Sequence, residues 1–162
     1  MVTETVKTSQ KTEDSSSSEV SQKFTEAASP FILPIDEKYL ATAVITKRQE
    51  GDTYETYFFL DSGAEIKAVI AGKIVGVIHD FKQKTVENSP AYQGFNIDND
   101  NSTIKASYVL IGKTLVEEGD IVTQGQKIAI SDGGNFVWRQ GNFFIVIADT
   151  SQENWKYLDL LK

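Results

Sequence analysis

The chain has 162 residues, which is long enough for one domain with a sizeable hydrophobic core, and 40% of its residues are hydrophobic. Its net charge of -7 argues against nucleic acid as a partner, because phosphate binding needs a basic face. It has no cysteine, which excludes disulfides, thiolate zinc sites and cysteine nucleophiles. No apolar run is long enough for a transmembrane segment.

Residues 1–29 form a polar segment that is rich in Ser, Thr, Glu and Lys, with consecutive serines at 15–18. Its apolar residues follow neither a helix period nor a strand period. Burial of so few apolar side chains cannot repay the entropy of ordering the chain. We therefore predict a disordered tether at 1–29 and a folded domain at 30–162. A tether of this kind suits a protein that is anchored to a membrane or to a cell wall.

The first half of the domain has short β-prone segments separated by turn residues. Residues 39–47 alternate, with Ala41, Ala43 and Ile45 on one face, and the segment after them is unusually aromatic. Turns are expected between the segments, where Gly and Asp gather. The predicted strands of this half are 39–47, 53–60, 65–70 and 73–81.

The second half continues this pattern of short strands. Residues 94–98 and 103–111 are predicted to form a hairpin around the Asn- and Asp-rich turn at 99–102. The last strand, 142–148, does not alternate between apolar and polar residues, so we expect both of its faces to be buried. Residues 155–161 would close the domain as a short helix or a turn. Many short strands without a long helical pattern predict an all-β antiparallel sandwich.

The stretch 115–130 is the most regular part of the sequence, and we predict two short strands there, joined by tight turns. Gly119 and Gly125 stand where such turns need a positive φ, which glycine adopts at little cost. An earlier stretch, 63–77, has a matching half-pattern of β runs and glycine turns. The two stretches together resemble the duplicated hybrid motif of lipoyl-type carriers, sugar-transport phosphocarriers and LytM-type zinc endopeptidases.

From about Phe31 to the C-terminus, the sequence resembles the LytM-type (lysostaphin-like) zinc metallopeptidases, which cut peptidoglycan cross-bridges. The motifs that carry the resemblance are Ile32-Leu33-Pro34, Ile45-Thr46-Lys47-Arg48, Gly63-x-x-Ile66-x-Ala68, Phe95-Asn96-Ile97-Asp98 followed by Tyr108, and Val116 to Ile128. The resemblance implies a LytM-like antiparallel β-sandwich with a lipoyl-type hybrid motif. It also implies an extracytoplasmic bacterial location, in the periplasm or at the cell surface, with Met1 in place of a removed N-terminal signal.

The zinc ligands and catalytic histidines of that family are replaced in this sequence. The resemblance implies that the His and Asp of the family's His-x-x-x-Asp segment fall on Tyr54 and Phe58, and that its His-x-His falls on Asn142-Phe143-Phe144. Its general-base histidine falls on Leu110. Catalytic zinc needs three protein donors, and the single histidine, His79, lies outside all of these positions. We therefore predict a degenerate domain that is not an enzyme and needs no cofactor.

A non-catalytic member of this family would act as a binding module of the cell envelope. It would regulate or scaffold cell-wall enzymes through the former active-site groove, with a cell-wall amidase, an envelope complex or peptidoglycan as its partner. The alternative is a structural or peptidoglycan-binding domain whose old metal site is filled by core residues. The residues expected to line the groove are Arg48, Tyr54, Phe58, Leu110, Trp138, Asn142 and Phe144.

Other candidate sites have weaker support in the sequence. A phosphocarrier site at His79 would need a second histidine and a glycine-rich surround, so we expect a solvent-exposed histidine at a strand end. Residues 98–102 alternate oxygen donors like a calcium loop but lack its glycine and its bidentate glutamate, so we predict a β-turn. Glu117 and Glu118 are expected in a solvated turn, and no tripeptide matches the attachment lysine of a lipoyl or biotinyl carrier.

Overall fold

The computed structural model describes residues 31–82, 89–136 and 141–162, and those ranges contain one short helix and eleven strands. The tether predicted at 1–29 lies outside the described residues. The all-β antiparallel architecture predicted from the sequence is confirmed. The elements in chain order are α1 Glu37–Leu40, β1 Val44–Glu50, β2 Thr53–Phe59, β3 Glu65–Lys67, β4 Gly72–Phe81, β5 Tyr92–Asp98, β6 Ile104–Leu110, β7 Gly112–Thr114, β8 Ile121–Val122, β9 Lys127–Ser131, β10 Phe143–Asp149 and β11 Lys156–Leu158.

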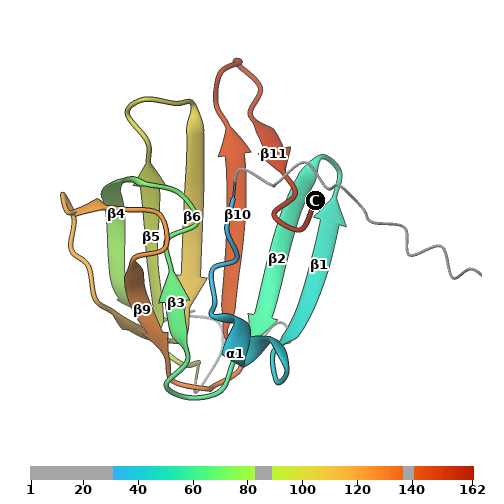
Figure 1. Ribbon diagram of the computed structural model, residues 1–162, viewed down its shortest axis with the longest axis vertical. Coiled ribbons are helices and arrows are strands. Elements are labelled where there is room, and N and C mark those ends of the chain that lie inside the picture. Colours follow the sequence, from blue (N-terminus) through green and yellow to red (C-terminus); the bar gives the residue numbers. More distant parts are fainter. Residues whose placement is uncertain (1–30, 83–88, 137–140) are drawn as a thin grey trace, which may run out of the picture.

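Eight strands form one large antiparallel sheet in the order β1-β2-β10-β6-β5-β4-β8, with β11 paired to β10 outside this order (Figure 1). The hairpins β1–β2 and β5–β6 join neighbours in the sequence, whereas β10 inserts between β2 and β6. β2 pairs with β10 only at residues 143–145. Residues 147–149 of β10 pair with β11 instead of β2. Figure 1 shows β11 between the upper parts of β10 and β2.

A second sheet of three strands, in the order β3-β9-β7, packs against one face of the large sheet (Figure 1). The core between the sheets contains branched side chains from the small sheet, such as Ile66 and Ile128, and aromatic rings from the large one. Phe95, Tyr108 and Phe143 stack in a row, with ring centroids 5.0 and 6.0 Å apart. Removal of this apolar layer from water is the main favourable contribution to folding.

The two glycine-rich stretches lie side by side in the structure. β3 of the first stretch pairs with β9 of the second, and β4 pairs with β8. Ala68 exchanges two backbone hydrogen bonds with residues 125–126, and Ile74 exchanges two with residues 119–120, all of 2.8 to 2.9 Å. Gly119 and Gly125 have φ values of 97° and 83°, so the positive-φ turns predicted at these positions are confirmed.

Two of the predicted strands differ from the structure by three or more residues at one end or both, whereas the others differ by at most two. The strand predicted at 39–47 begins only at Val44, because Tyr39 lies in α1. Short apolar runs do not distinguish a helical turn from a strand, which explains the difference. The strand predicted at 65–70 ends at Lys67, since Ala68 bonds to residues 125 and 126 of the turn that precedes β9 instead of continuing the ladder with β9.

The last two predicted elements also need correction. β10 is not buried on both faces: Phe143 and Ile145 are buried in the core, whereas Phe144 and Val146 on the other face are half-buried. An antiparallel sheet that is covered by a second sheet on one side leaves its other face for solvent or loops. Residues 155–161 form β11 and a turn, not a helix, because they complete the pairing of β10.

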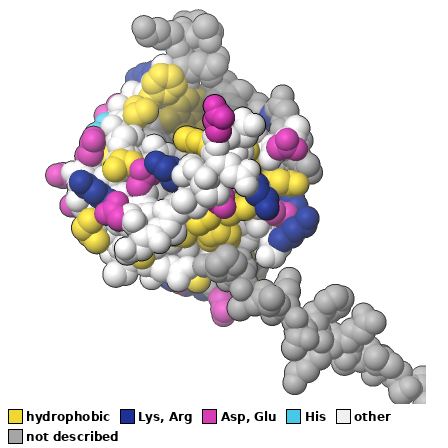
Figure 2. Space-filling model, turned by 90° about the horizontal axis from the view of Figure 1, so that it is seen from above, with side chains coloured by type: hydrophobic (Ala, Val, Ile, Leu, Met, Phe, Trp, Pro, Cys, Tyr) yellow, Lys and Arg dark blue, Asp and Glu magenta, His cyan; other side chains and the backbone are white. Residues whose placement is uncertain are grey.

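Within the described ranges, the four-residue α1 is the only helix, and it is far too short to cross a membrane. At the end of the molecule seen in Figure 2, acidic, basic and hydrophobic side chains are interspersed. The described side chains on that end therefore form no continuous basic stripe of the kind that binds nucleic acid.

Candidate functional site

The large sheet has an inner face, which packs on the small sheet, and an outer face, which carries the candidate site. Side chains alternate between the two faces along each strand. The cross-strand pairs Tyr57↔Phe144 and Phe144↔Val109 place these three side chains together on the outer face. Their neighbours in the chain, Phe58 and Phe143, point inward to the core.

Aromatic side chains form a second, smaller core on the outer face, which we call the aromatic cluster. Its buried members are Tyr57, Tyr92, Ile111 and Phe136, and Val109 and Phe144 pack against them. The ring centroid of Phe144 lies 5.1 Å from that of Tyr57 and 5.8 Å from that of Phe136. Phe136 comes from the loop between β9 and β10, where its N–H donates to Gly141 O at 2.7 Å. Phe136 therefore joins the aromatic cluster from outside the strands of the sheet.

Polar side chains of β1 and β2 border the aromatic cluster. The Tyr57 hydroxyl donates to Glu55 Oε2 at 2.7 Å, and Arg48 Nη1 lies 3.8 Å from the same oxygen. Burial raises the pKa of the Tyr57 phenol, and its hydrogen bond to Glu55 raises it further, so the phenol stays neutral. The Glu55 carboxylate thus accepts a hydrogen bond from Tyr57 on the cluster side and pairs with the Arg48 guanidinium on the other.

Three residues predicted to line the former active-site groove lie on the inner face instead. Phe58 and Leu110 are 0% exposed and are cross-strand neighbours of the core residue Phe143. Tyr54 shares the face of Phe58, and Lys47 Nζ lies 5.3 Å from its ring centroid. These three side chains cannot line one groove with Phe144, because they point to the opposite face of the sheet.

Asn142, a fourth predicted groove residue, has a structural role just before β10. It is 0% exposed, and its side-chain amide exchanges two hydrogen bonds with the backbone of Leu60. The Leu60 N–H donates to Asn142 Oδ1 at 3.0 Å, and Asn142 Nδ2 donates to Leu60 O at 2.7 Å. The amide is therefore committed to the end of β2 and does not face a ligand.

Arg48 and Phe144 are the predicted groove residues that the structure places on the outer face, at the border and at the centre of the aromatic cluster. Trp138 lies outside the described residues. Sequence patterns do not single out Tyr57 or Phe136. Strand alternation from Phe144 would have found Tyr57 once the register of β2 and β10 was known, but no local signal marks Phe136, which reaches the sheet from a loop.

The residues at the predicted zinc positions do not fit a catalytic zinc ion. On β2, the residue opposite Phe144 of β10 is Tyr57, one residue before the predicted Phe58. Tyr57 is a neutral phenol bonded to Glu55, and Phe144 has no donor atom. Catalytic zinc is bound by histidine nitrogen or carboxylate oxygen atoms of three residues. Among the residues described, no group of three or more His, Cys, Asp or Glu could hold a metal ion.

A groove, which we call the outer groove, lies next to the aromatic cluster on the same face of the large sheet. It has a volume of about 420 Å³ and crosses β4, β5, β6 and β10. Trp155 and Tyr157 border it on the side of β11, and the Lys105–Asp98 ion pair of 2.7 Å lies across β6 and β5. Its other lining residues are Thr53, Val75, Asn96, Ser107, Val146 and Ala148.

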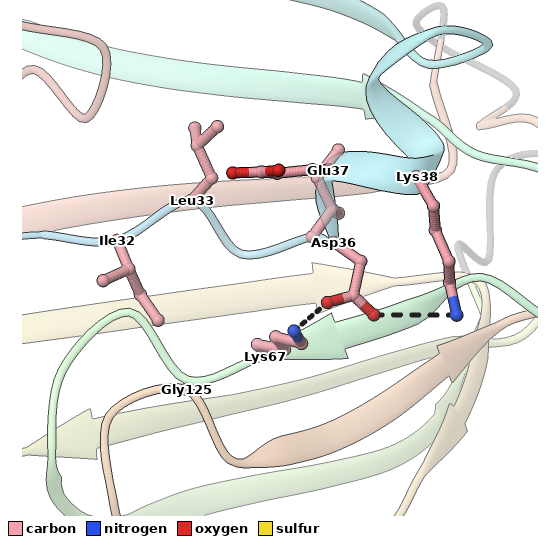
Figure 3. Close-up of a pocket in the computed structure, with 8 residues that line it drawn as sticks. Ile32, Leu33, Asp36, Glu37, Lys38, Lys67 and Gly125 are labelled. Carbon is pink, nitrogen blue, oxygen red and sulfur yellow. Dashed lines mark hydrogen bonds and ion pairs between the residues drawn. The ribbon is translucent and has the colours of Figure 1, made fainter.

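A second pocket, with a volume of about 760 Å³, lies between the opening segment and the turn that holds Gly125 (Figure 3). Figure 3 shows the Asp36 carboxylate between the ammonium groups of Lys67 and Lys38. The hydrogen bond from Lys67 lowers the pKa of Asp36. The ion pair between Asp36 and Lys67 ties residues 31–36 to β3, and both lysines of the pocket are paired with the same carboxylate.

The structure also tests the predictions for His79, for the turn at 99–102 and for the pair Glu117 and Glu118. His79 lies near the end of β4 and is exposed, as predicted, with its Nδ1 3.2 Å from Gln93 Oε1. Residues 99–102 form the turn between β5 and β6, where the Asn101 N–H donates to Asn99 Oδ1 at 2.9 Å, so the predicted β-turn is confirmed. Glu117 and Glu118 are exposed in the predicted turn.

Solved structures of peptidases share this fold. No protein-family model matches the sequence, and no curated protein matches it. Lysostaphin, from Staphylococcus simulans, aligns with a TM-score of 0.51 and 18% identity over 72% of this chain and 49% of lysostaphin. A zinc-containing peptidase from Vibrio cholerae aligns with a TM-score of 0.52 and 22% identity over 80% of this chain and 38% of that peptidase.

The LytM-like fold predicted from the sequence is therefore confirmed. This chain spans about half of lysostaphin and less of the second peptidase. At these identities the likeness establishes the fold alone, and the chemistry has to be argued from the side chains of this chain.

Proposed function

We propose that this domain is a non-catalytic binding module of the bacterial cell envelope, which regulates or scaffolds cell-wall enzymes through its outer sheet face. The observation that carries the proposal is the aromatic cluster. Phe144, which the resemblance aligns with a zinc ligand, packs on Tyr57 with ring centroids 5.1 Å apart. These side chains supply neither a metal site nor a proton shuttle. The fold shared with lysostaphin supports an extracytoplasmic setting, in the periplasm or at the cell surface.

The surface beside the aromatic cluster is suited to a protein partner. Val44 and Phe59 are cross-strand neighbours on β1 and β2, and they are 55% and 41% exposed. Together with Thr46 and Asn135 they line a small pocket of about 260 Å³. Covering such side chains removes apolar area from water, which favours association with a partner. A cell-wall amidase or a subunit of an envelope complex is the partner we propose, with peptidoglycan as the other candidate.

The proposal is tested by mixing the purified protein with purified cell-wall amidases of its source organism. We expect the protein to bind at least one amidase and to change its activity on peptidoglycan. The double substitution Val44→Thr and Phe59→Ser should abolish both effects. It should leave the melting temperature nearly unchanged, because exposed side chains contribute little to stability.

Ile121→Ser is the matched control for that experiment. Ile121 is an apolar side chain that is 71% exposed on β8, at the opposite edge of the large sheet from β1. The control should bind and act like the wild type. A folded wild-type protein that binds no amidase and changes no amidase activity would contradict the regulatory role.

A structural domain whose old metal site is filled by core residues is the second candidate function. The full burial of Phe58, Leu110 and Asn142 favours it. Under this alternative, substitutions on the outer face would change stability or nothing at all, and neither an amidase nor sedimented peptidoglycan would retain the protein. The binding experiment therefore separates the two functions.

A further inference from the structure

We propose that the outer groove binds a neutral saccharide, with Trp155 as the platform for a sugar ring. The inference deepens the proposed function, since it names a ligand class for the same sheet face. It rests on the proposed function only for the source of the saccharide, which would be the glycan strands of the cell wall.

Trp155 is a large aromatic side chain that remains in solvent. It is 55% exposed just before β11, and Tyr157, two residues later, is half-buried beside it in the groove. Burial of an aromatic side chain is ordinarily favourable, so an exposed tryptophan at the border of a groove is informative. The apolar C–H face of a sugar ring packs on an aromatic ring and removes it from water.

The floor of the outer groove offers hydrogen-bonding groups that the protein does not use. Among the residues described, neither the Asn96 amide nor the hydroxyls of Ser107 and Thr53 have a hydrogen-bond partner. An amide has both donors and an acceptor, and a hydroxyl both donates and accepts. Sugar hydroxyls have the same dual character, so they can replace the water that otherwise satisfies these groups.

The outer groove has no unpaired charge among its described lining residues. Lys105 and Asp98 are its cation and its anion, and they form an ion pair of 2.7 Å. A phosphate or an acidic ligand would need an unpaired cation, and a basic ligand would need an unpaired anion. The charge balance therefore favours a neutral ligand.

An extended peptide fits the outer groove less well than a saccharide. The floor lies in the middle of the large sheet, where the backbone groups of β5, β6 and β10 pair with one another. Peptides that add to a sheet use the backbone groups of a free edge strand. A saccharide needs only side chains, and a volume of about 420 Å³ lies within the range of small-molecule sites.

The experiment is a titration of the full chain, labelled with ¹⁵N, with chitotetraose in its N-acetylated form and separately with cellotetraose. We expect the Trp155 indole and the amides of the groove strands to shift in the ¹H–¹⁵N spectrum. A ligand concentration of about 10 mM would saturate even a site with a Kd of about 1 mM. Trp155→Ala should weaken binding roughly tenfold, and Asn96→Ala should weaken it severalfold.

Unchanged spectra away from the groove show that these variants remain folded, and Ile121→Ala should bind like the wild type because it lies outside the groove. No shift of groove residues at that concentration would overturn the inference. So would binding that Trp155→Ala leaves unchanged, or a stronger response of the same residues to pentaglycine. Failure here is distinct from failure of the proposed function, since Val44→Thr with Phe59→Ser should lose amidase binding and keep saccharide binding.

Discussion

At the scale of single residues, Asn142 has a structural role, although the resemblance predicted it at the first histidine of the family's His-x-His. Its amide satisfies both backbone groups of Leu60, which follows the last residue of β2. Leu60 is 1% exposed, so water cannot replace the amide. A buried backbone group without a partner costs about 1–3 kcal/mol. The side chain thus extends the sheet by one pair of hydrogen bonds beyond the ladder.

Asn142→Ala should lower the free energy of unfolding by about 2–4 kcal/mol, because it leaves the N–H and the C=O of Leu60 buried and unpaired. Urea denaturation at neutral pH measures this change. Asn101→Ala, in the exposed turn between β5 and β6, is the control and should stay within about 0.5 kcal/mol of the wild type. Equal stabilities of the two variants would show that the amide of Asn142 has no structural role.

At the scale of elements, an ion pair ties the C-terminal turn to the first strand. Lys47 on β1 bonds to Asp159, which follows β11. The side chain of Asp159 is only 5% exposed. Burial by itself would raise the pKa of Asp159, but the hydrogen bonds from Lys47 and from the Leu161 N–H bring it below its ordinary value of 3.8. Leu160, the next residue, packs into the main core.

The ion pair predicts a specific loss of stability in acid. Because the pKa of Asp159 is lower in the folded than in the unfolded chain, its contribution is full above pH 3.8 and is lost as the pH falls through the folded-state pKa. Asp159→Asn should be less stable than the wild type at about pH 7, and the difference should shrink below about pH 4. Denaturation at a series of pH values measures it.

Lys47→Met is the second variant for that test. It leaves the buried Asp159 carboxylate without its lysine, so burial should then raise the pKa of that group. Parallel loss of stability in the wild type and in Asp159→Asn down to about pH 3 would mean that this ion pair does not contribute to acid sensitivity.

At the scale of the whole molecule, the two faces of the large sheet have different roles, one in stability and one in the candidate site. The inner face carries the core, including Phe58 and Leu110, and the outer face carries the aromatic cluster and the outer groove. A zinc peptidase needs three donors and a proton shuttle that converge on one face. In this chain Phe144 packs on Tyr57 on the outer face, and three of the positions predicted for the chemistry, Phe58, Leu110 and Asn142, are fully buried.

This arrangement predicts that the purified protein binds no stoichiometric zinc and does not hydrolyse peptidoglycan. Zinc content is measured by metal analysis after dialysis and by melting with and without chelator. Hydrolysis is measured by the turbidity of purified cell walls against a heat-killed sample. Leu110→His should not create activity, because that side chain points to the inner face next to Phe143. One zinc per chain, a melting temperature that falls with chelator, or wall hydrolysis above the control would contradict the proposal of a non-catalytic domain.

The sequence by itself determined the local structure and the fold. The glycine turns at 119 and 125, the turn at 99–102 and most strands could be predicted, because alternation and positive-φ requirements act between neighbouring residues. The resemblance over 116–128 likewise led to the LytM-like fold. These features need no knowledge of which strands are partners.

Only the tertiary structure decided which side chains share the candidate site. Tyr57 faces Phe144 and Phe58 does not, because the register between β2 and β10 joins residues that are far apart in the sequence. A shift of one residue in a strand moves a side chain to the opposite face. Phe136 and Trp155 reach the outer face from a loop and from the start of β11, whose positions depend on packing. Local pattern specifies the strands, whereas the long-range pairing of strands specifies the site.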